Sequence, residues 1–471
     1  MSPKTDPKKK QAVKKAKAPK TIKAIDLGPP RPVPQLPRPK APVLPGLTER
    51  TLSNGLRVIA VRRSGLPLVQ LRLVLTTSRP KVTPAETARQ QVLGAAFTSG
   101  TSTRTAAQIA VDLDGLGGTM AAGADEEAVS IFGSVLAPNL KAWLAVLSDV
   151  ITDATFPASE VGTERDRVAQ GIVASLADPS TVATNEMFAR YFGEHPYGVR
   201  HADPELVRQV TSAQLKAYVR SRVGPGGGTL VIVGDVPAAA AINAVEAALG
   251  TWASGTSSAP LAAHLPPAPG AAYMIDRPGA VQTNIRVVGA AVDRNDPTLP
   301  ALTLATTILG GGMTSRLFLN LREDKGYTYT PGAGIMHLRA HSAWYAVADV
   351  GVDVTGPALA ELRYELGRIS SLPVAEDELE NTKRYLIGTQ ALSIQSMAGL
   401  AGRITGLAVA GLGPDWLKTW VKALDAASLD DVLAAAQRHL GPGHVTTVLV
   451  GDKEKILAGV AAQMPVTLVE G

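Results

Sequence analysis

A glycine-rich stretch from Leu309 to Gly334 contains the residues of this sequence that are best suited to chemistry. It reads LGGGMTSRLFLNLREDKGYTYTPGAG, with three glycines before an arginine and two tyrosines. Glycines allow the backbone to turn sharply or to approach another surface closely. The guanidinium of Arg316 is a permanent fork of hydrogen-bond donors that suits carboxylates or carbonyl oxygens.

The same stretch predicts the local structure that would position these residues. Thr314 or Ser315 can cap a helix that carries Leu317, Phe318 and Leu321 on one side. Arg316 then falls in the first turn, where a cation opposes the helix dipole unless another group requires it. Gly326 is placed to end the helix. Tyr327 and Tyr329 follow, and alternate residues of an extended segment face the same way.

The stretch resembles the arginine-tyrosine segment of the pitrilysin and insulinase family of zinc peptidases, the inverzincins, which include the mitochondrial processing peptidases. In that family Gly-Gly-Gly-x-x-Ser-Arg-Leu-Phe leads into a short helix ending in Arg-Glu and then Gly-x-x-Tyr. The family's arginine falls on Arg316 and its tyrosine on Tyr329, while Tyr327 takes a position that is usually aliphatic. Three glycines alone would fit a plain turn before an amphipathic helix, but the complete run is more specific. The stretch does not predict a phosphate loop, because no Gly-Lys-Ser/Thr follows the glycines.

The charge of the chain is concentrated at its beginning. The 471 residues carry a formal net charge of +6, but residues 1–45 hold twelve Lys or Arg against two Asp, a net of +10. The remaining residues therefore carry 6 − 10 = −4. The first segment has no aromatic residue and ends in a proline-rich stretch, which predicts a disordered basic tail. Without aromatic residues among its charges it lacks the means to stack on bases, and nothing in it is suited to entering lipid.

An internal repeat organises the rest of the chain. GPGGGTLVIVGD at 224–235 recurs as GPGHVTTVLVGD at 441–452, an offset of 217 residues, and each copy predicts a turn followed by a buried strand. We therefore predict a tail over 1–45, a first domain over 46–254, a linker over 255–270 and a second domain over 271–471.

Within each half, strand patterns come first, then helices, then a closing strand. The strands are expected at 56–61 and 69–75, and at 272–276 and 283–289; helices are expected at 105–116 and 139–151. This order indicates an α+β fold of two homologous α/β-sandwich-like domains, each an antiparallel-dominated sheet with helices on one face. The family resemblance covers roughly Leu47 to Leu468 and implies a clam-shaped arrangement.

The zinc motif of the family is missing from this chain. Active inverzincins carry H-x-x-E-H on the first long helix and a further glutamate downstream as third ligand. Those five positions fall on residues 91–95, so that Gln91 and Ala95 replace the histidines and Gly94 replaces the glutamate; Gly171 falls on the third ligand. The first histidine of the sequence is His195, so the first domain cannot form this site and we predict no metal in the chain.

The other histidines do not predict a metal site either. His337 and His341 are four residues apart, but their segment has a strand pattern, where that spacing is too long for one ion without a fold-back. His195 precedes a proline and predicts a turn.

By resemblance, the chain is the zinc-less subunit of a heterodimeric metallopeptidase whose homologous partner carries H-x-x-E-H and zinc. Arg316 would position an extended peptide and Tyr329 would donate to the developing oxyanion, both acting in trans. Gly310, Gly311, Gly312 and Tyr327 would contribute to substrate binding, and either tyrosine could be the working one.

Two other functions remain open. An inert structural subunit, like the family's core proteins in respiratory complexes, needs no catalytic residues. Binding of nucleic acid through the basic tail is the less favoured interpretation. Since the beginning of the chain lacks the apolar stretch of a secretory signal and no apolar run is long enough to span a membrane, we expect a soluble, cytoplasmic protein without a membrane partner.

Overall fold

The computed structural model describes residues 37, 39–77, 81–253, 259, 261–267, 269–270 and 272–470. Residues 39–471 form a compact unit separate from residues 1–38. Most of the predicted tail, and residues 255–258, 260 and 268 of the predicted linker, lie outside the described residues. Ala41 and Leu44 also belong to the predicted tail, yet they pack against the hydrophobic core of the second half. The folded part of the chain therefore begins several residues before position 46.

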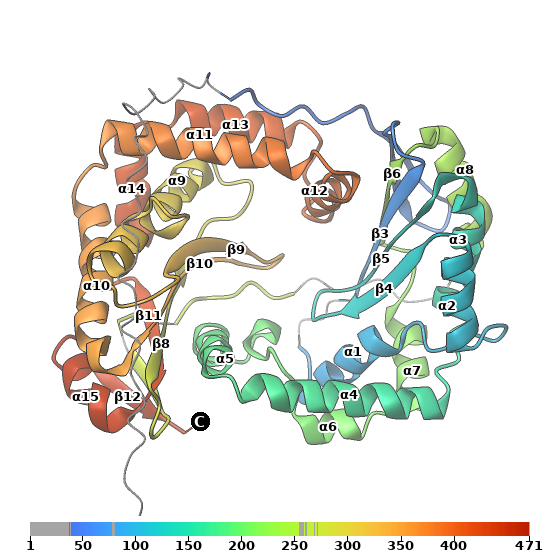
Figure 1. Ribbon diagram of the computed structural model, residues 1–471. Helices are drawn as coiled ribbons and strands as arrows, with labels where there is room; N and C mark the ends of the chain where they lie inside the picture. The colour runs from blue at the N-terminus through green and yellow to red at the C-terminus, as the bar shows by residue number, and fades with distance from the viewer. Residues whose placement is uncertain are drawn as a thin grey trace, which may run out of the picture. The chain divides into compact units, whose positions relative to one another are not determined.

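Two six-stranded mixed sheets form the framework (Figure 1). The first has the order β1-β2-β6-β3-β5-β4, with β1 (Thr48–Thr51), β2 (Arg57–Arg62), β3 (Leu68–Thr76), β4 (Thr119–Ala124), β5 (Ala128–Leu136) and β6 (Thr229–Gly234). The second has the order β12-β7-β11-β8-β10-β9, with β7 (Ala272–Asp276), β8 (Gln282–Ala290), β9 (Gly332–His337), β10 (Ser342–Gly351), β11 (Val445–Gly451) and β12 (Val466–Val469). Parallel pairing is confined to β2 with β6 and to β7 with β11 and β12 among these strands.

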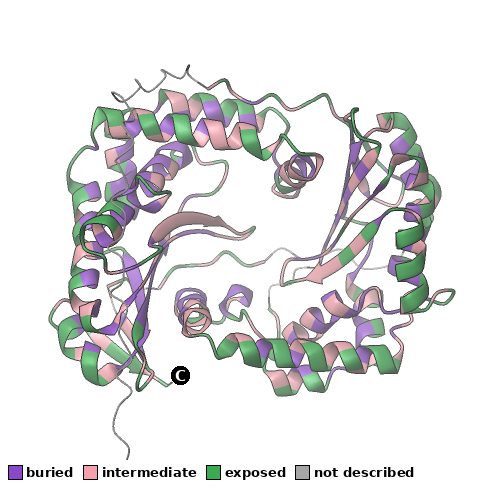
Figure 2. Cartoon of the chain, viewed as in Figure 1, coloured by how far each residue is buried: buried purple, intermediate pink, exposed green. Residues whose placement is uncertain are grey.

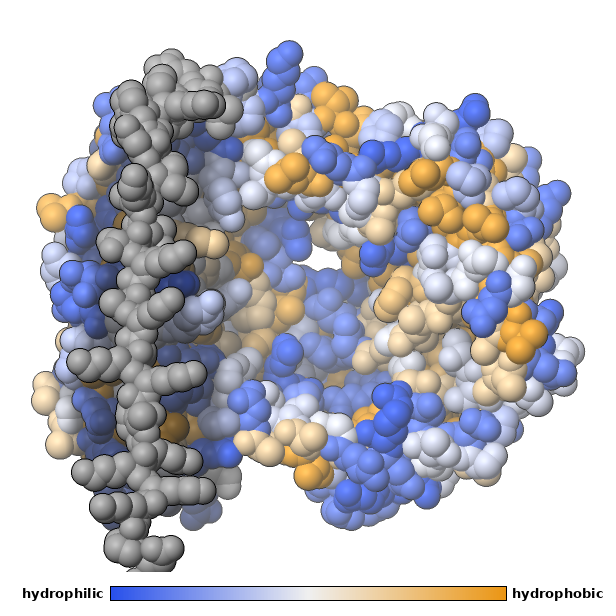
Figure 3. All heavy atoms as spheres, in the orientation of Figure 1, coloured by the Kyte–Doolittle hydropathy of each residue, from blue (hydrophilic) through white to orange (hydrophobic). Residues whose placement is uncertain are grey.

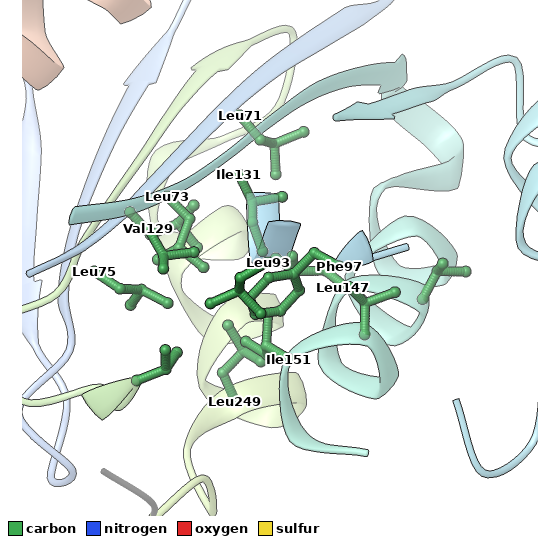
Figure 4. Packing of buried hydrophobic residues seen from close by; sticks show 14 of the residues in the cluster. Leu71, Leu73, Leu75, Leu93, Phe97, Val129, Ile131, Leu147, Ile151 and Leu249 are labelled. Carbon is green, nitrogen blue, oxygen red and sulfur yellow. The ribbon is translucent and has the colours of Figure 1, made fainter. Parts of the chain in front are cut away.

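The helices of the first half are α1 (Pro84–Ala96), α2 (Ala106–Gly115), α3 (Leu140–Thr152), α4 (Ala158–Leu176), α5 (Pro179–Phe192), α6 (Pro204–Arg208), α7 (Ser212–Arg222) and α8 (Ala238–Leu249). Most of them cover one face of the first sheet, because their apolar stripes and the alternate residues of the strands form one core. Figure 4 shows leucines of β3 and residues of β5 directed toward side chains of α1 and α3. In α3, which was predicted at 139–151, the residues that form a stripe at helical spacing are buried: Leu140, Trp143, Leu144, Leu147, Val150 and Ile151.

The second half repeats this plan. Its helices are α9 (Leu299–Gly310), α10 (Thr355–Ser371), α11 (Glu376–Ser393), α12 (Met397–Val409), α13 (Trp416–Ala426), α14 (Leu429–His439) and α15 (Lys453–Ala461). The strands β6 and β11, predicted from the repeat, are both fully buried. The predicted α+β fold of two similar halves is confirmed, and the predicted helices and strands lie within two residues of the observed ones.

One helix of each half packs on the sheet of the other half. Leu400 and Ile404 of α12 pack against Val231 and other residues of β2 and β6 in the first sheet. In return, Phe188 of α5 packs with Val448 in the second sheet. The prediction placed helices on one face of each sheet only. In each half the opposite face of the sheet is instead partly covered by a helix from the other half. Both of these helices, α5 and α12, carry buried residues (Figure 2).

The described surface is mixed in character. On the face drawn in Figure 3, hydrophilic and hydrophobic residues are interspersed. Within the described residues, none of the helices combines the length and the apolar character that crossing a membrane requires.

Candidate functional site

The three glycines of the predicted site have different surroundings. Gly310 ends α9 and lies so close to β9 that a Cβ atom there would be 2.4 Å from the backbone nitrogen of Ala333. A Cβ at Gly311 would be 2.6 Å from Cγ2 of Thr307. At Gly312 a Cβ would meet only Tyr385, at 4.0 Å. Packing therefore requires the first two glycines, while the third is exposed and leaves open space beside Tyr385.

The helix expected after the glycines is present, with a wider turn than predicted. It is a π-helix over Phe318–Asp324, in which the Lys325 amide donates to the Asn320 carbonyl at 3.0 Å. No side-chain cap hydrogen bond forms at the start of this helix, and the Ser315 hydroxyl donates to the Gly312 carbonyl at 2.6 Å. The predicted apolar side is buried, and it consists of Leu317, Phe318 and Leu321. Gly326 ends the helix with a φ of +66°, as expected.

Arg316 lies against the first turn of α11. Its Nε donates to Oε1 of Glu378 at 2.9 Å and its Nη2 donates to Oε2 at 2.8 Å. The arginine side chain is only 8% exposed, and its buried Nη1 has no hydrogen-bond partner among the described residues. The bidentate contact with the Glu378 carboxylate thus compensates for the position of a cation in the first turn of the helix. The sequence did not predict this contact.

The two tyrosines do not face the same way. The Tyr329 side chain is 78% exposed, whereas Tyr327 is half-buried and packs against the second core. Between them Thr328 bridges to Val350 and donates its hydroxyl proton to the Asp349 carbonyl at 2.7 Å. This anchor fixes the irregular segment so that Tyr329 is the accessible phenol.

Arg322 links the π-helix to Tyr329 and was not among the predicted site residues. Its guanidinium lies 4.5 Å from the centre of the Tyr329 ring and 4.6 Å from that of Phe318. Its Nη1 also donates to the Tyr329 carbonyl at 3.2 Å. The cation therefore lies over both rings and steadies the exposed tyrosine. The signal for it was the Arg-Glu pair that ends the helix of the family pattern.

The positions of the missing zinc motif lie on α1, as predicted. The Gln91 side chain donates to the Arg200 carbonyl at 3.0 Å and accepts from the Ala202 amide at 3.2 Å. At Gly94 a Cβ atom would be 2.7 Å from the backbone nitrogen of Ala124, because α1 packs closely on β4. Gly171 lies on α4 with open space around it. These residues offer no imidazole or carboxylate and do not fit a zinc ion.

The histidines take part in other contacts. The chain does fold back between His337 and His341, since β9 and β10 form a hairpin there. Even so, Nδ1 of His337 lies 2.9 Å from the Ser342 hydroxyl, and Nε2 of His341 lies 2.9 Å from the Tyr191 hydroxyl. His195 caps a short turn through the Tyr197 amide, as predicted. Over the described part of the chain, no three His, Asp or Glu side chains form a group that could hold a metal.

Comparison with known proteins identifies the family. The sequence profile described as Insulinase (Peptidase family M16) matches residues 93–205, and that described as Peptidase M16 inactive domain matches residues 209–386. An uncharacterized zinc protease of Streptomyces coelicolor is 25% identical over 422 residues, covering 86% of this chain and 90% of that protein. The uncharacterized zinc protease YmxG of Bacillus subtilis is 22% identical over 347 residues, covering 74% of this chain and 84% of that protein.

Solved structures agree in fold. A peptidase M16 inactive domain from Pseudomonas fluorescens has a TM-score of 0.80 at 22% identity, covering 86% of this chain and 98% of that one. A protease from Helicobacter pylori has a TM-score of 0.77 at 17% identity, covering 87% and 100%. The chain belongs to the insulinase family of peptidases, family M16.

Proposed function

We propose that this chain is the zinc-less subunit of a heterodimeric zinc endopeptidase and that it contributes Tyr329 and Arg316 in trans to a shared active site. The observation that carries the proposal is the exposed Tyr329 beside a complete arginine-tyrosine segment, in a chain whose zinc-ligand positions hold Gln91, Ala95 and Gly171. The partner is a homologous chain with H-x-x-E-H, and zinc bound there would activate the attacking water. The substrate is a peptide or leader segment in an extended conformation.

Tyr329 suits the role of a donor to the oxyanion that forms as water attacks the peptide carbonyl. Its side chain is 78% exposed, and the Arg322 guanidinium over the ring limits its movement. A donor that is already held in position stabilises the negative charge without further reorganisation. Tyr327, which packs against the core, supports the backbone of the site, so the structure favours Tyr329 as the working tyrosine.

Arg316 has a less direct route to the peptide. Two of its nitrogens are bound to Glu378, which leaves only the buried Nη1 for a substrate carbonyl. Contact requires the turn at Gly312 to move, and the open space there permits this. In our proposal Arg316 therefore positions the glycine turn and offers one donor when the peptide arrives.

A mixture of the purified chain with a zinc-loaded H-x-x-E-H partner and a fluorogenic peptide tests the proposal. Turnover should require both chains, and Tyr329→Phe should lower kcat by about 100-fold, as loss of one oxyanion donor does. Arg316→Ala should also lower turnover. Tyr364→Phe, at a tyrosine of α10 that is 57% exposed, is the matched control and should leave the rate unchanged.

The alternative is a catalytically inert structural subunit, and the burial and pairing of Arg316 favour it. It predicts that the partner alone is fully active, or that turnover of the mixture is the same with Tyr329→Phe and Arg316→Ala as with the unaltered chain. Either result would reject the catalytic proposal.

A further inference from the structure

The internal repeat places two arginines at equivalent positions, Arg72 on β3 and Arg286 on β8. In the sheet ladders Arg72 lies opposite Val231, and Arg286 lies opposite Val448. The two valines differ in number by 448 − 231 = 217, which is the offset of the sequence repeat. Since Val231 packs against α12 and Val448 packs against α5, each arginine lies on the sheet face that receives a helix from the other half.

Arg286 is fully engaged by its surroundings. Its Nη1 donates to Oδ1 of Asp349 at 2.7 Å, its Nη2 donates to the Ser180 hydroxyl at 2.6 Å, and its Nε donates to the Thr184 hydroxyl at 3.3 Å. The residue is 3% exposed. A carboxylate from the neighbouring strand and two hydroxyls from α5 thus neutralise and bind this buried cation.

Arg72 has lost each of these partners. Asp349 lies opposite Asn284, and the equivalent pair in the first sheet is Ser134 opposite Gln70, so the carboxylate is replaced by a hydroxyl. At the repeat offset, Met397 and Ala401 of α12 replace the two hydroxyl residues of α5.

The Arg72 guanidinium instead lies beside Gly402 of α12, 3.7 Å from where a Cβ would be. Arg72 is half-buried and, among the described residues, makes no hydrogen bond or ion pair.

A cavity lies further along α12. Gly402, Gly406 and Val409 follow one another at helical spacing and form a single stripe of the helix. Gly406 and Val409 line a cavity of about 530 Å³, whose other side is formed by Arg294 and residues of the β9–β10 hairpin. The two glycines leave about 6 Å of helix surface without side chains, onto which a peptide backbone can pack closely.

An unpaired cation, Arg294, also lines this cavity. Among the described residues, the Arg294 guanidinium has no hydrogen bond or ion pair, and burial lowers its pKa. Burial, together with the charge of Arg294, lowers the pKa of Arg403 and lowers that of His337 to about 4. His337 is therefore neutral at neutral pH, and the positive charge is carried by arginines.

Two acidic residues, Asp293 and Glu127, also line the cavity. Glu127 already accepts hydrogen bonds from the Tyr197 hydroxyl and the Arg339 amide, and Asp293 forms no ion pair with Arg294. The guanidiniums of Arg72 and Arg294 thus remain without a carboxylate from the described part of the chain.

We propose that Arg72, beside Gly402, and Arg294, in the cavity lined by Gly406, bind carboxylates of an acidic peptide segment laid along the glycine stripe of α12. This inference rests on the proposed function, because it takes the bound peptide to be the substrate. It adds that the substrate carries acidic residues. Unpaired guanidiniums supply the charge, and the glycines supply the surface for a peptide backbone.

Binding by the isolated full-length chain, without partner or zinc, tests the inference separately from catalysis. The probe is a short fluorescein-labelled peptide of alternating Glu and Ala, followed by fluorescence anisotropy. Arg72→Gln and Arg294→Gln should each weaken binding roughly tenfold, the effect of losing one charge-assisted hydrogen bond. Arg220→Gln, which removes the same charge from an exposed position on α7, should leave the affinity unchanged.

A second variant tests the stripe without changing charge. A Cβ atom added at Gly406 would have no atom within 4 Å, so Gly406→Leu should retain the fold. The new side chain should obstruct the peptide and weaken its binding. A Gln-and-Ala peptide should fail to bind the unaltered chain.

The inference is overturned if the acidic peptide binds all variants equally. It is also overturned if labelled single-stranded DNA binds as tightly and is lost in the same two arginine variants, since the site would then serve nucleic acid. Loss of peptide binding in Arg72→Gln and Arg294→Gln, with turnover unaffected by Tyr329→Phe, would reject the catalytic proposal but uphold this one.

Discussion

Arg316 and Glu378 form a bidentate pair that joins the glycine-rich turn to the start of α11, with N–O distances of 2.9 and 2.8 Å. The two residues are 62 positions apart in the sequence. The arginine that the family resemblance assigns to substrate is therefore also a structural link within the second half. Its position depends on one carboxylate.

Glu378→Ala should destabilise the protein by about 3 kcal/mol, because it leaves a buried guanidinium without its counter-charge. Urea unfolding followed by circular dichroism measures the change. The double variant Arg316→Ala with Glu378→Ala should lose less than the sum of the two single variants, since the unpaired charge is gone. If the double variant loses as much free energy of unfolding as the two single variants together, the two residues are not coupled.

Gly94→Glu, which restores the catalytic glutamate of the family pattern, should destabilise the chain by about 3 kcal/mol because α1 has no room for it against β4. Gly171→Glu is the matched control, since that position is open and a glutamate suits a helix better than glycine. Thermal unfolding of both variants gives the comparison. Equal melting temperatures would mean that β4 moves away from α1 easily.

The stability of the fold should fall as the pH drops from about 6.5 to about 4. In the folded chain burial, together with the charges of His341 and His195, lowers the pKa of His264 to about 4. In the unfolded chain His264 takes up a proton near pH 6.5, whereas in the folded chain it stays neutral at that pH. The neutral ring therefore contributes stability that is present above about pH 6.5 and is lost toward about pH 4.

His264→Phe should reduce this pH dependence, because a phenyl ring can replace the imidazole against Tyr191 and Phe192 without titrating. Urea unfolding at pH 7.5, 6 and 5 measures the free energy of unfolding for both proteins, with His444→Gln as a control outside this cluster. A variant whose stability falls as steeply as that of the unaltered chain would contradict the assignment.

Much of the fold could be predicted from the sequence because its strands and helices have strong patterns. The buried strands at Val231 and Val448 could be predicted from the sequence repeat, and the helix at Trp143 could be predicted from its local periodicity. The exchange of α5 and α12 was missed, since an apolar stripe shows that a helix is buried but not which sheet covers it.

The same limit applies to the candidate site. Arg316, Gly326 and Tyr329 could be located from a contiguous motif, including the end of the helix at Gly326. Glu378 could not, because its contact depends on how α11 packs on the turn. The different exposure of Tyr327 and Tyr329 also depends on a distant bridge, from Thr328 to Val350.

The reciprocal packing of α5 and α12 suggests how such a chain could arise. A single ancestral half would have had one bare sheet face and one spare helix, and two identical copies would have satisfied each other as a symmetric homodimer. Such a pair of copies would need only a tether to become one chain. Once fused, the copies could diverge, and a pair of equivalent arginines could be neutralised in one and left free in the other.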